Sequence, residues 1–269
     1  MENQKLLEFN KNLKKNILYM AKIGGASSAH IGGALSLTEI FSVLFSNFID
    51  IREDLEKGNK FILSKGHACL ALYCVLFETK IISENELNEF EKDGSDLLGH
   101  PVKNKNLKIP FSTGSLGMGL GLGIGMAIGI KKKQSNKKVY VVLGDGECNE
   151  GSVWESIMLA PKYKLSNLTA IIDKNGYQQT GSTETILKND NLEEKIKSFG
   201  WNTISIDGHS IDEIKLALKK NFNNDKPIMI IAKTIKGKGI PEFENDNKWH
   251  HATLTEEIYL RSLAKLNEI

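Results

Sequence analysis

The sequence is poor in the features that mark secreted, membrane-bound and nucleic-acid-binding proteins. Its three cysteines, Cys69, Cys74 and Cys148, have unrelated spacings, which excludes a disulfide framework and a CxxC metal pair. Lysine plus arginine total 35 and aspartate plus glutamate 33, a balance that excludes a nucleic-acid face carried by bulk charge. The polar stretch at residues 1–5 is not followed by the apolar core of a signal peptide. We therefore expect a globular protein of the cytoplasm.

The sequence also lacks a hydrophobic run long enough to cross a membrane, which takes about 20 apolar residues. The longest run, residues 116–130, is interrupted by glycines and followed by three lysines. Four of these glycines recur at every fourth position (117, 121, 125 and 129), which on a helix makes a stripe free of side chains. We expect a buried helix here, packed closely against a neighbour and without membrane contact. Its N-terminal end is a candidate for ligand contact.

Two common phosphate-binding motifs are absent as well. A P-loop would need serine or threonine after Gly237-Lys238, where Gly239 stands. The glycine-rich run also never satisfies the Gly-x-Gly-x-x-Gly/Ala pattern of dinucleotide-binding proteins. A P-loop nucleoside triphosphatase and a Rossmann dehydrogenase are thus disfavoured.

Helices and strands alternate along the predicted order of elements. Helical periodicity covers residues 6–20, 36–47, 68–77, 152–163, 211–222 and 255–266, and a small-residue loop covers 24–33. Short apolar runs predict strands at 61–63, 139–143, 168–172, 204–206 and 228–232. This order predicts an α/β fold in which a parallel β-sheet is flanked by helices on both faces. With no repeat or linker, we expect a single domain, residues 1–269, with a helical C-terminal tail at 255–266.

Polar residues follow two of the predicted strands at the point where each strand ends. Asp145, flanked by Gly144 and Gly146, follows the strand at 139–143, and Asn175 follows the strand at 168–172. Ligands of parallel sheets bind beyond the carboxyl ends of the strands, and a carboxylate with an amide oxygen suits Mg²⁺ bound to phosphate. The pattern predicts a Mg²⁺-diphosphate site if the two strands are neighbours. The alternative is two unrelated turns, because Gly-Asp-Gly and Asn-Gly are also favoured turn sequences.

Six motifs together resemble the transketolase family. Gly144-Asp145-Gly146, followed after 28 residues by Asn175, is similar to the thiamine-diphosphate motif. The motifs occur in the order found in that family: SSAHIGG (27–33), LSKGHA (63–68), GHP (99–101), STGSLG (112–117), GDGECNEG (144–151) and KGKG (236–239). The resemblance covers nearly the whole chain and implies the thiamine-diphosphate-binding fold of the family's diphosphate domain.

The resemblance also implies roles at the cofactor. Asp145 and Asn175 match Mg²⁺ ligands, and Tyr177 stands where the family lends a backbone carbonyl to the metal. His67 and His250 match histidines near the cofactor diphosphate, and we count His250 among the candidate catalytic residues.

Further matches concern the substrate and the rest of the cofactor. His30 and His100 match catalytic-site histidines that line the substrate channel and hydrogen-bond to ketose hydroxyls. Gly114 and Leu116 match residues whose backbone meets the aminopyrimidine ring. Glu150 matches an acidic residue at the subunit interface.

The sequence departs from the family pattern at four positions near these motifs. Ser115 replaces a usual proline, and Met118 replaces a usual glutamine. Gln179 stands where an apolar side chain usually packs near the thiazolium ring. His251 follows His250 where glycine is common, which leaves open which histidine faces the site.

One histidine lies outside all of these motifs. His209 follows Asp207-Gly208 and is predicted to be a turn residue without a catalytic role.

The resemblance implies the N-terminal subunit of a split transketolase. Full-length transketolases continue with a pyrimidine-binding domain, which brings the glutamate that protonates the pyrimidine, and with a C-terminal domain. We therefore expect a thiamine-diphosphate- and Mg²⁺-dependent enzyme that moves a two-carbon ketol unit from a ketose phosphate to an aldose. We expect it to act only with a partner subunit carrying the pyrimidine-binding domain, in a heterotetramer built around a homodimer of this chain.

Two alternatives remain open from the sequence. The first is another thiamine-diphosphate enzyme subunit, similar to deoxyxylulose-phosphate synthase or to a 2-oxoacid dehydrogenase, against which His30 and His100 argue. The second is a non-catalytic assembly subunit, which would not need the hard-cation ligands Asp145 and Asn175.

Overall fold

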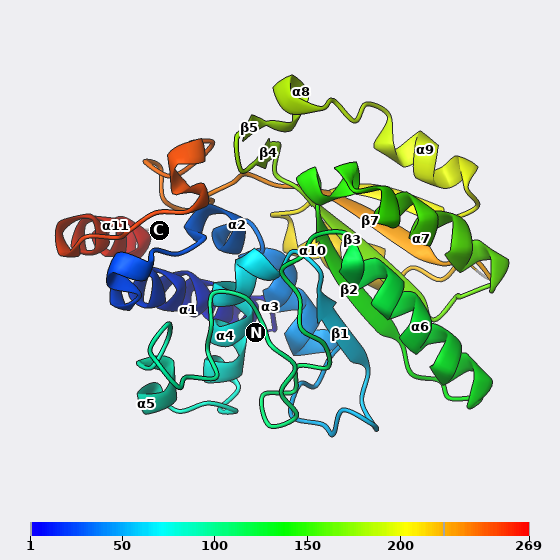
Figure 1. The fold of residues 1–269 in the computed structure, drawn as a ribbon, viewed down its shortest axis with the longest axis horizontal. Helices are drawn as coiled ribbons and strands as arrows, with labels where there is room; N and C mark the ends of the chain where they lie inside the picture. Colours follow the sequence, from blue (N-terminus) through cyan, green and yellow to red (C-terminus); the bar gives the residue numbers. More distant parts are fainter. Residues whose placement is uncertain (1, 223, 269) are drawn as a thin grey trace.

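A single five-stranded sheet organises the chain, for which a computed structural model describes residues 2–222 and 224–268 (Figure 1). The strand order is β1-β2-β3-β7-β6, and every neighbouring pair is parallel. The strands are β1 (Lys60–Leu63), β2 (Val139–Gly144), β3 (Leu168–Lys174), β6 (Asn202–Asp207) and β7 (Ile228–Lys233). A short antiparallel pair, β4 (Tyr177–Gln178) with β5 (Gly181–Ser182), follows β3. The predicted parallel sheet is confirmed.

Helices cover both faces of the sheet, because alternate strand residues point to opposite sides. Tyr140 and Val142 of β2 enter one hydrophobic layer, and Val139, Val141 and Leu143 enter the other. The first layer contains α1 (Glu2–Ile23), α2 (Ile31–Leu35), α3 (Thr38–Asn47), α4 (Cys69–Glu78) and α10 (Ile211–Lys219). The second contains α6 (Met118–Lys132), α7 (Gly151–Lys162) and α9 (Leu192–Ser198). The predicted arrangement of helices on both faces is therefore confirmed.

The remaining helices lie at the margins of these layers. Two are short, α5 (Glu84–Leu87) and α8 (Thr183–Ile186). The expected C-terminal helix is α11 (Glu256–Glu268), which packs beside α1 (Figure 1). None of the helices in the described ranges is long and apolar enough to span a membrane. The single-domain assignment stays a prediction, and its residues 1, 223 and 269 lie outside the described residues.

Two local expectations differ from the structure. The small-residue loop predicted at 24–33 ends three residues early, because α2 begins at Ile31. The helix predicted at 211–222 ends at Lys219, since the next residue, Lys220, has extended backbone angles (φ −62°, ψ 124°).

The glycines of α6 agree only in part with the predicted stripe. A Cβ at Gly123 would lie 2.4 Å from Cγ2 of Val141 on β2, and Gly119 is equally tight against the segment after β1. Of the predicted stripe, Gly117 is buried and closely packed against Glu150 and Ser152, whereas Gly121 and Gly125 are exposed. The helix is thus buried on one face only, and the stripe at 117, 121, 125 and 129 is not its contact with the sheet.

Candidate functional site

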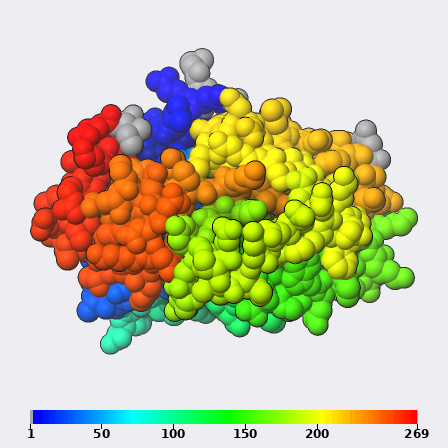
Figure 2. Space-filling view, turned by 90° about the horizontal axis from the view of Figure 1, so that it is seen from above, coloured from blue at the N-terminus to red at the C-terminus, as the bar shows by residue number. Residues whose placement is uncertain are grey.

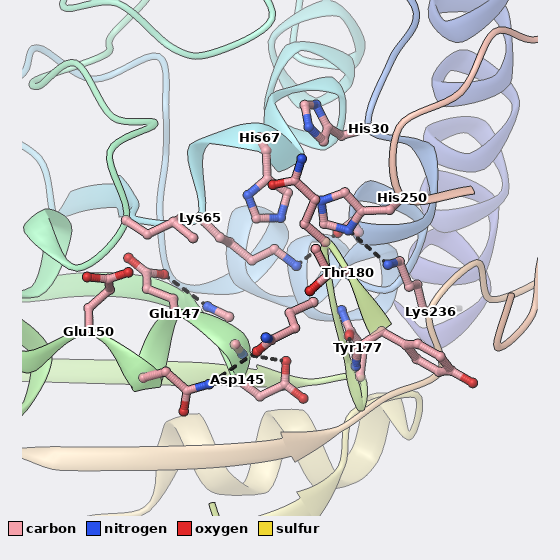
Figure 3. A pocket seen from close by; sticks show the side chains of 18 of the residues that line it. His30, Lys65, His67, Asp145, Glu147, Glu150, Tyr177, Thr180, Lys236 and His250 are labelled. Atoms are coloured by element: carbon pink, nitrogen blue, oxygen red, sulfur yellow. Dashed lines mark hydrogen bonds between the residues drawn. The ribbon is translucent and has the colours of Figure 1, made fainter. Parts of the chain in front are cut away.

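The carboxyl ends of four neighbouring strands, β1, β2, β3 and β7, open into one cavity of about 400 Å³ (Figure 3). All eleven predicted cofactor, metal and catalytic residues line it, and so does Glu150. They are His30, His67, His100, Gly114, Leu116, Gly144, Asp145, Gly146, Asn175, Tyr177 and His250. The volume lies within the range of small-molecule sites, roughly 300–1,000 Å³. The structure therefore brings together residues that are spread over more than 200 positions of sequence.

Asp145 and Asn175 follow neighbouring strands, as the predicted metal site requires. Register pairs Gly144 of β2 with Asp173 of β3, so the two strands end side by side. The Asp145 carboxylate accepts hydrogen bonds from the backbone N–H of Gly146 (2.9 Å) and of Gly176 (2.7 Å). These bonds fix the carboxylate at the cavity floor.

The electrostatic setting of Asp145 suits a cation. Burial and the nearby carboxylate of Asp173 together raise the pKa of the Asp145 carboxyl to about 6, against the opposing effect of its backbone hydrogen bonds. A bound divalent cation would stabilise the ionised carboxylate of Asp145 and so oppose both effects. Among the described residues, no group of three or more His, Cys, Asp or Glu side chains could hold a metal ion. A cation here would need amide, carbonyl, water and phosphate oxygens besides the one carboxylate, which is the ligand set common for Mg²⁺.

A buried ion pair lies beneath the cavity. Lys65 Nζ is 2.5 Å from Asp173 Oδ2, and both side chains are almost completely excluded from solvent. Asp173 also accepts hydrogen bonds from the hydroxyls of Ser36 (2.6 Å) and Thr234 and from the Asn175 amide (3.2 Å). These contacts satisfy Asp173 without a metal, so it acts as a support for the loops. Sequence reasoning assigned neither residue a role, although Lys65 stands in the LSKGHA motif and Asp173 follows a predicted buried strand.

Lys236 contributes a second cation to the cavity wall. Its Nζ donates to Asn247 Oδ1 (2.7 Å) and to His250 Nδ1 (2.9 Å). Burial, together with the charge of Lys65, lowers the pKa of Lys236 to about 8. Because the charge of Lys65 is paired with Asp173, the ammonium group of Lys236 is the one that favours an anionic ligand such as a phosphate ester. Lys236 was missed as a site residue, although it opens the KGKG motif.

Five histidines gather at the cavity mouth. The ring of His30 lies 5.3 Å from His67, 5.6 Å from His100, 5.4 Å from His250 and 4.5 Å from His251, measured between ring centres. Burial, with some repulsion from neighbouring cationic groups, lowers the pKa of His30 to about 3 and that of His250 to about 4, and it holds the pKa of His67 well below its usual value. These three rings are neutral at neutral pH. Neutral imidazoles can each donate and accept one hydrogen bond, which suits a polyhydroxylated ligand.

His250, and not His251, lines the cavity. An ammonium group can only donate, so Nδ1 of His250 accepts from Lys236 and Nε2 carries the proton. His251 is exposed, and its ring lies against His30 at the rim. Gln179 also lines the cavity, and its backbone carbonyl accepts from Asn247 (2.8 Å). This contact joins the segments before β5 and after β7, which meet side by side in Figure 2.

The loop before α6 is shaped around His100 and Glu147. A Cβ at Gly114, whose φ is +147°, would lie 2.9 Å from Cδ2 of His100, so a larger residue would displace that ring. The buried Glu147 carboxylate accepts from the Ser64 hydroxyl and from the N–H groups of Gly117 (2.9 Å) and Gly144 (3.1 Å). Glu147 thus ties the loop to the ends of β1 and β2, a role that sequence reasoning missed.

The known proteins that this chain resembles are described as transketolases or as subunits of transketolases. The family described as "Transketolase, thiamine diphosphate binding domain" matches residues 11–264. An apulose-4-phosphate transketolase subunit of Phocaeicola vulgatus is 36% identical, over 97% of this chain and 93% of that protein. A 6-deoxy-6-sulfo-D-fructose transketolase subunit of Clostridium sp. is 34% identical over 93% of both.

Longer proteins match over part of their length. Human transketolase is 40% identical over 87% of this chain, which covers 38% of that protein. The crystal structure of transketolase from Campylobacter jejuni superposes with a TM-score of 0.88 at 29% identity, covering 98% of this chain and 43% of that one. The chain therefore spans about two fifths of these longer proteins and nearly all of the subunit-sized relatives.

Proposed function

This chain belongs to the transketolase family, whose thiamine-diphosphate-binding domain it forms, and we propose that it is the N-terminal subunit of a two-chain transketolase. The reaction would move a two-carbon ketol unit from a ketose phosphate to an aldose or aldose phosphate. The observation that carries the proposal is that Asp145 and Asn175 follow adjacent parallel strands and line one cavity together with Lys65 and Lys236.

The cofactor would be thiamine diphosphate with Mg²⁺. When bound, it supplies the carbanion-stabilising chemistry, and the protein supplies binding and orientation. Asp145, Asn175 and the backbone carbonyl of Tyr177 would hold the metal. Lys236 would offset part of the diphosphate charge. The raised pKa of Asp145 supports cation binding, because a cation would stabilise the ionised carboxylate.

The histidines would handle the sugar. His30 and His100 would hydrogen-bond to ketose hydroxyls, and their proximity at the cavity mouth supports this. His250 would present its Nε2–H toward the ligand, because Lys236 occupies Nδ1. The neutral resting state of His30 and His250 adds no further positive charge beside Lys236.

We further propose that the chain forms a homodimer within a heterotetramer whose other chain carries the pyrimidine-binding domain. Two relatives that match over nearly their full length are named as subunits. On this chain, large apolar side chains are exposed on the packed helices α6 and α7, at Met118, Met158 and Leu159, and at Tyr163, the residue after α7. Such an exposed apolar surface is typical of a protein interface.

We also assign the protein to the cytoplasm. Its three cysteines are free and buried, which fits a reducing compartment.

The test is an assay of ketol transfer with thiamine diphosphate, Mg²⁺ and a ketose phosphate. The chain co-purified with a partner that carries a pyrimidine-binding domain should turn over, and the isolated chain should not. In the complex, Asp145→Ala should weaken cofactor binding, measured by calorimetry, at least ~10-fold. Turnover by the isolated chain would overturn the two-chain proposal, and unchanged cofactor affinity in Asp145→Ala would overturn the metal assignment.

A further inference from the structure

The turn formed by Asp207, Gly208 and His209 lies behind the cavity wall and has no place in the proposed chemistry. His209 is nevertheless only 13% exposed, and both of its ring nitrogens are bonded. Nδ1 lies 2.9 Å from Glu39 Oε2 on α3, and Nε2 lies 2.8 Å from the backbone nitrogen of Ile235, just after β7.

These two contacts define one protonation state of the ring. A backbone N–H can only donate, so Nε2 of His209 accepts from Ile235 and Nδ1 carries the proton that is donated to Glu39. Burial would raise the pKa of Glu39, but the hydrogen bond from His209 and the charge of Lys14 lower it to about 2. Glu39 also accepts from Asn10 (2.8 Å) and Lys14 (2.6 Å), so the carboxylate itself is held on three sides.

The turn presses directly against the chain that leaves β7. The N–H of Gly208 donates to the carbonyl of Lys233 (2.7 Å). A Cβ at Gly208 would lie 2.4 Å from Cγ2 of Thr234, so the two segments leave no room for a side chain there. The carboxylate of Asp207 accepts from the N–H of His209 (2.9 Å) and closes the turn.

The segment held in this way carries part of the site. The Thr234 hydroxyl donates to Asp173, beneath the cavity. Lys236 reaches the cavity wall and binds Asn247 and His250. The N–H of Ile235, between these two residues, has the imidazole of His209 as its hydrogen-bond acceptor.

We propose that His209 is a positioning residue of the cofactor site: its ring anchors the backbone at Ile235 to Glu39 and so sets the place of Lys236. The inference rests on the proposed binding of thiamine diphosphate in this cavity. The Asp-Gly-His turn takes no part in the cofactor chemistry, and its proposed function is to hold the segment after β7 in place.

Two substitutions of His209 distinguish its hydrogen bond with Ile235 from its hydrogen bond with Glu39. The carboxamide of glutamine reaches as far as Nε2, so His209→Gln can still accept from Ile235. The carboxamide of asparagine reaches only as far as Nδ1, so His209→Asn can still donate to Glu39 but leaves Ile235 without its acceptor. Gly208→Ala is an independent variant that displaces Thr234 and leaves the ring chemically intact.

The experiment measures thiamine diphosphate and Mg²⁺ binding by the complex with its partner subunit, beside thermal melts and amide hydrogen exchange at Ile235. His209→Asn and Gly208→Ala should each weaken cofactor binding ~10-fold, while His209→Gln should restore it to within ~3-fold of the wild type. The apparent KM for the cofactor should rise in His209→Asn, with kcat at saturating cofactor nearly unchanged. Exchange at Ile235 should accelerate in His209→Asn and not in His209→Gln.

The outcomes distinguish this inference from the function on which it rests. If the wild-type complex binds no cofactor, the proposed function fails and the inference with it. If the wild type binds and folded His209→Asn binds equally well, only the positioning role is overturned. Equal losses in His209→Asn and His209→Gln, tracking equal drops in melting temperature, would mean a purely structural histidine. Should His209→Asn not fold, unchanged affinity in Gly208→Ala would overturn the inference.

Discussion

At the scale of single residues, Asp145 links the site to the stability of the fold. Burial and Asp173 raise its pKa from 3.8 to about 6, so the folded chain holds this proton more tightly than the unfolded chain. A group of this kind contributes stability that is fully present below pH 3.8 and is lost as the pH rises through about 6. Without metal and cofactor, the wild type should therefore lose stability relative to Asp145→Asn between about pH 4 and pH 7, by at most about 3 kcal/mol. Urea unfolding of both proteins with a chelator at the two pH values measures this change; a constant difference would contradict it.

Two histidines offer a second test at this scale. His100 is exposed and His30 is only partly buried, so neither is part of the hydrophobic core. Replacing either by alanine should lower turnover of the complex ~10-fold or more, as expected for the loss of a substrate hydrogen bond, and leave the melting temperature nearly unchanged. A steady-state assay and a thermal melt distinguish a substrate contact from a structural role. If the histidine were structural, the variant would show a lower melting temperature before it lost activity.

At the scale of elements, α6 provides a matched pair of glycines. Gly123 touches Val141, so Gly123→Ala should overpack the helix against β2 and cost about 1–3 kcal/mol. Gly125 faces open space, and Gly125→Ala should instead stabilise the isolated chain by up to ~1 kcal/mol through helix propensity. Chemical denaturation measures the change in unfolding free energy of both variants. Equal changes would contradict the assignment of Gly123 to the sheet-facing side of α6 and of Gly125 to its exposed side.

Some elements of the fold could be predicted from the sequence, but the orientation of α6 could not. Strands β2 and β3 were predictable almost to their ends, because uninterrupted β-branched runs are typical of strands buried on both faces. The orientation of α6 was not, because glycines at 119 and 123 form a second stripe and periodicity does not say which stripe meets the sheet. The ion pair of Lys65 with Asp173 could not be predicted for another reason: the two residues are 108 positions apart, and charge alone does not reveal a buried partner. The predicted site residues could be chosen from sequence because they stand in recognisable motifs, and the structure places them around one cavity; their roles stay predictions.

At the scale of the whole molecule, the exposed apolar surface of α6 and α7 predicts self-association. Met158 is 56% exposed and lies near Leu159, whereas Leu216, 69% exposed, lies on α10 in the opposite layer. A stable pair typically buries about 1,200–2,000 Å² or more, which requires a continuous patch and not scattered side chains. Met158→Glu should therefore weaken the homodimer of the chain, because it places a charge in the apolar interface, while Leu216→Glu should leave it unchanged. Sedimentation velocity across a concentration series measures both. A monomeric wild type, or equal effects of the two variants, would mean that α6 and α7 do not form the interface between copies.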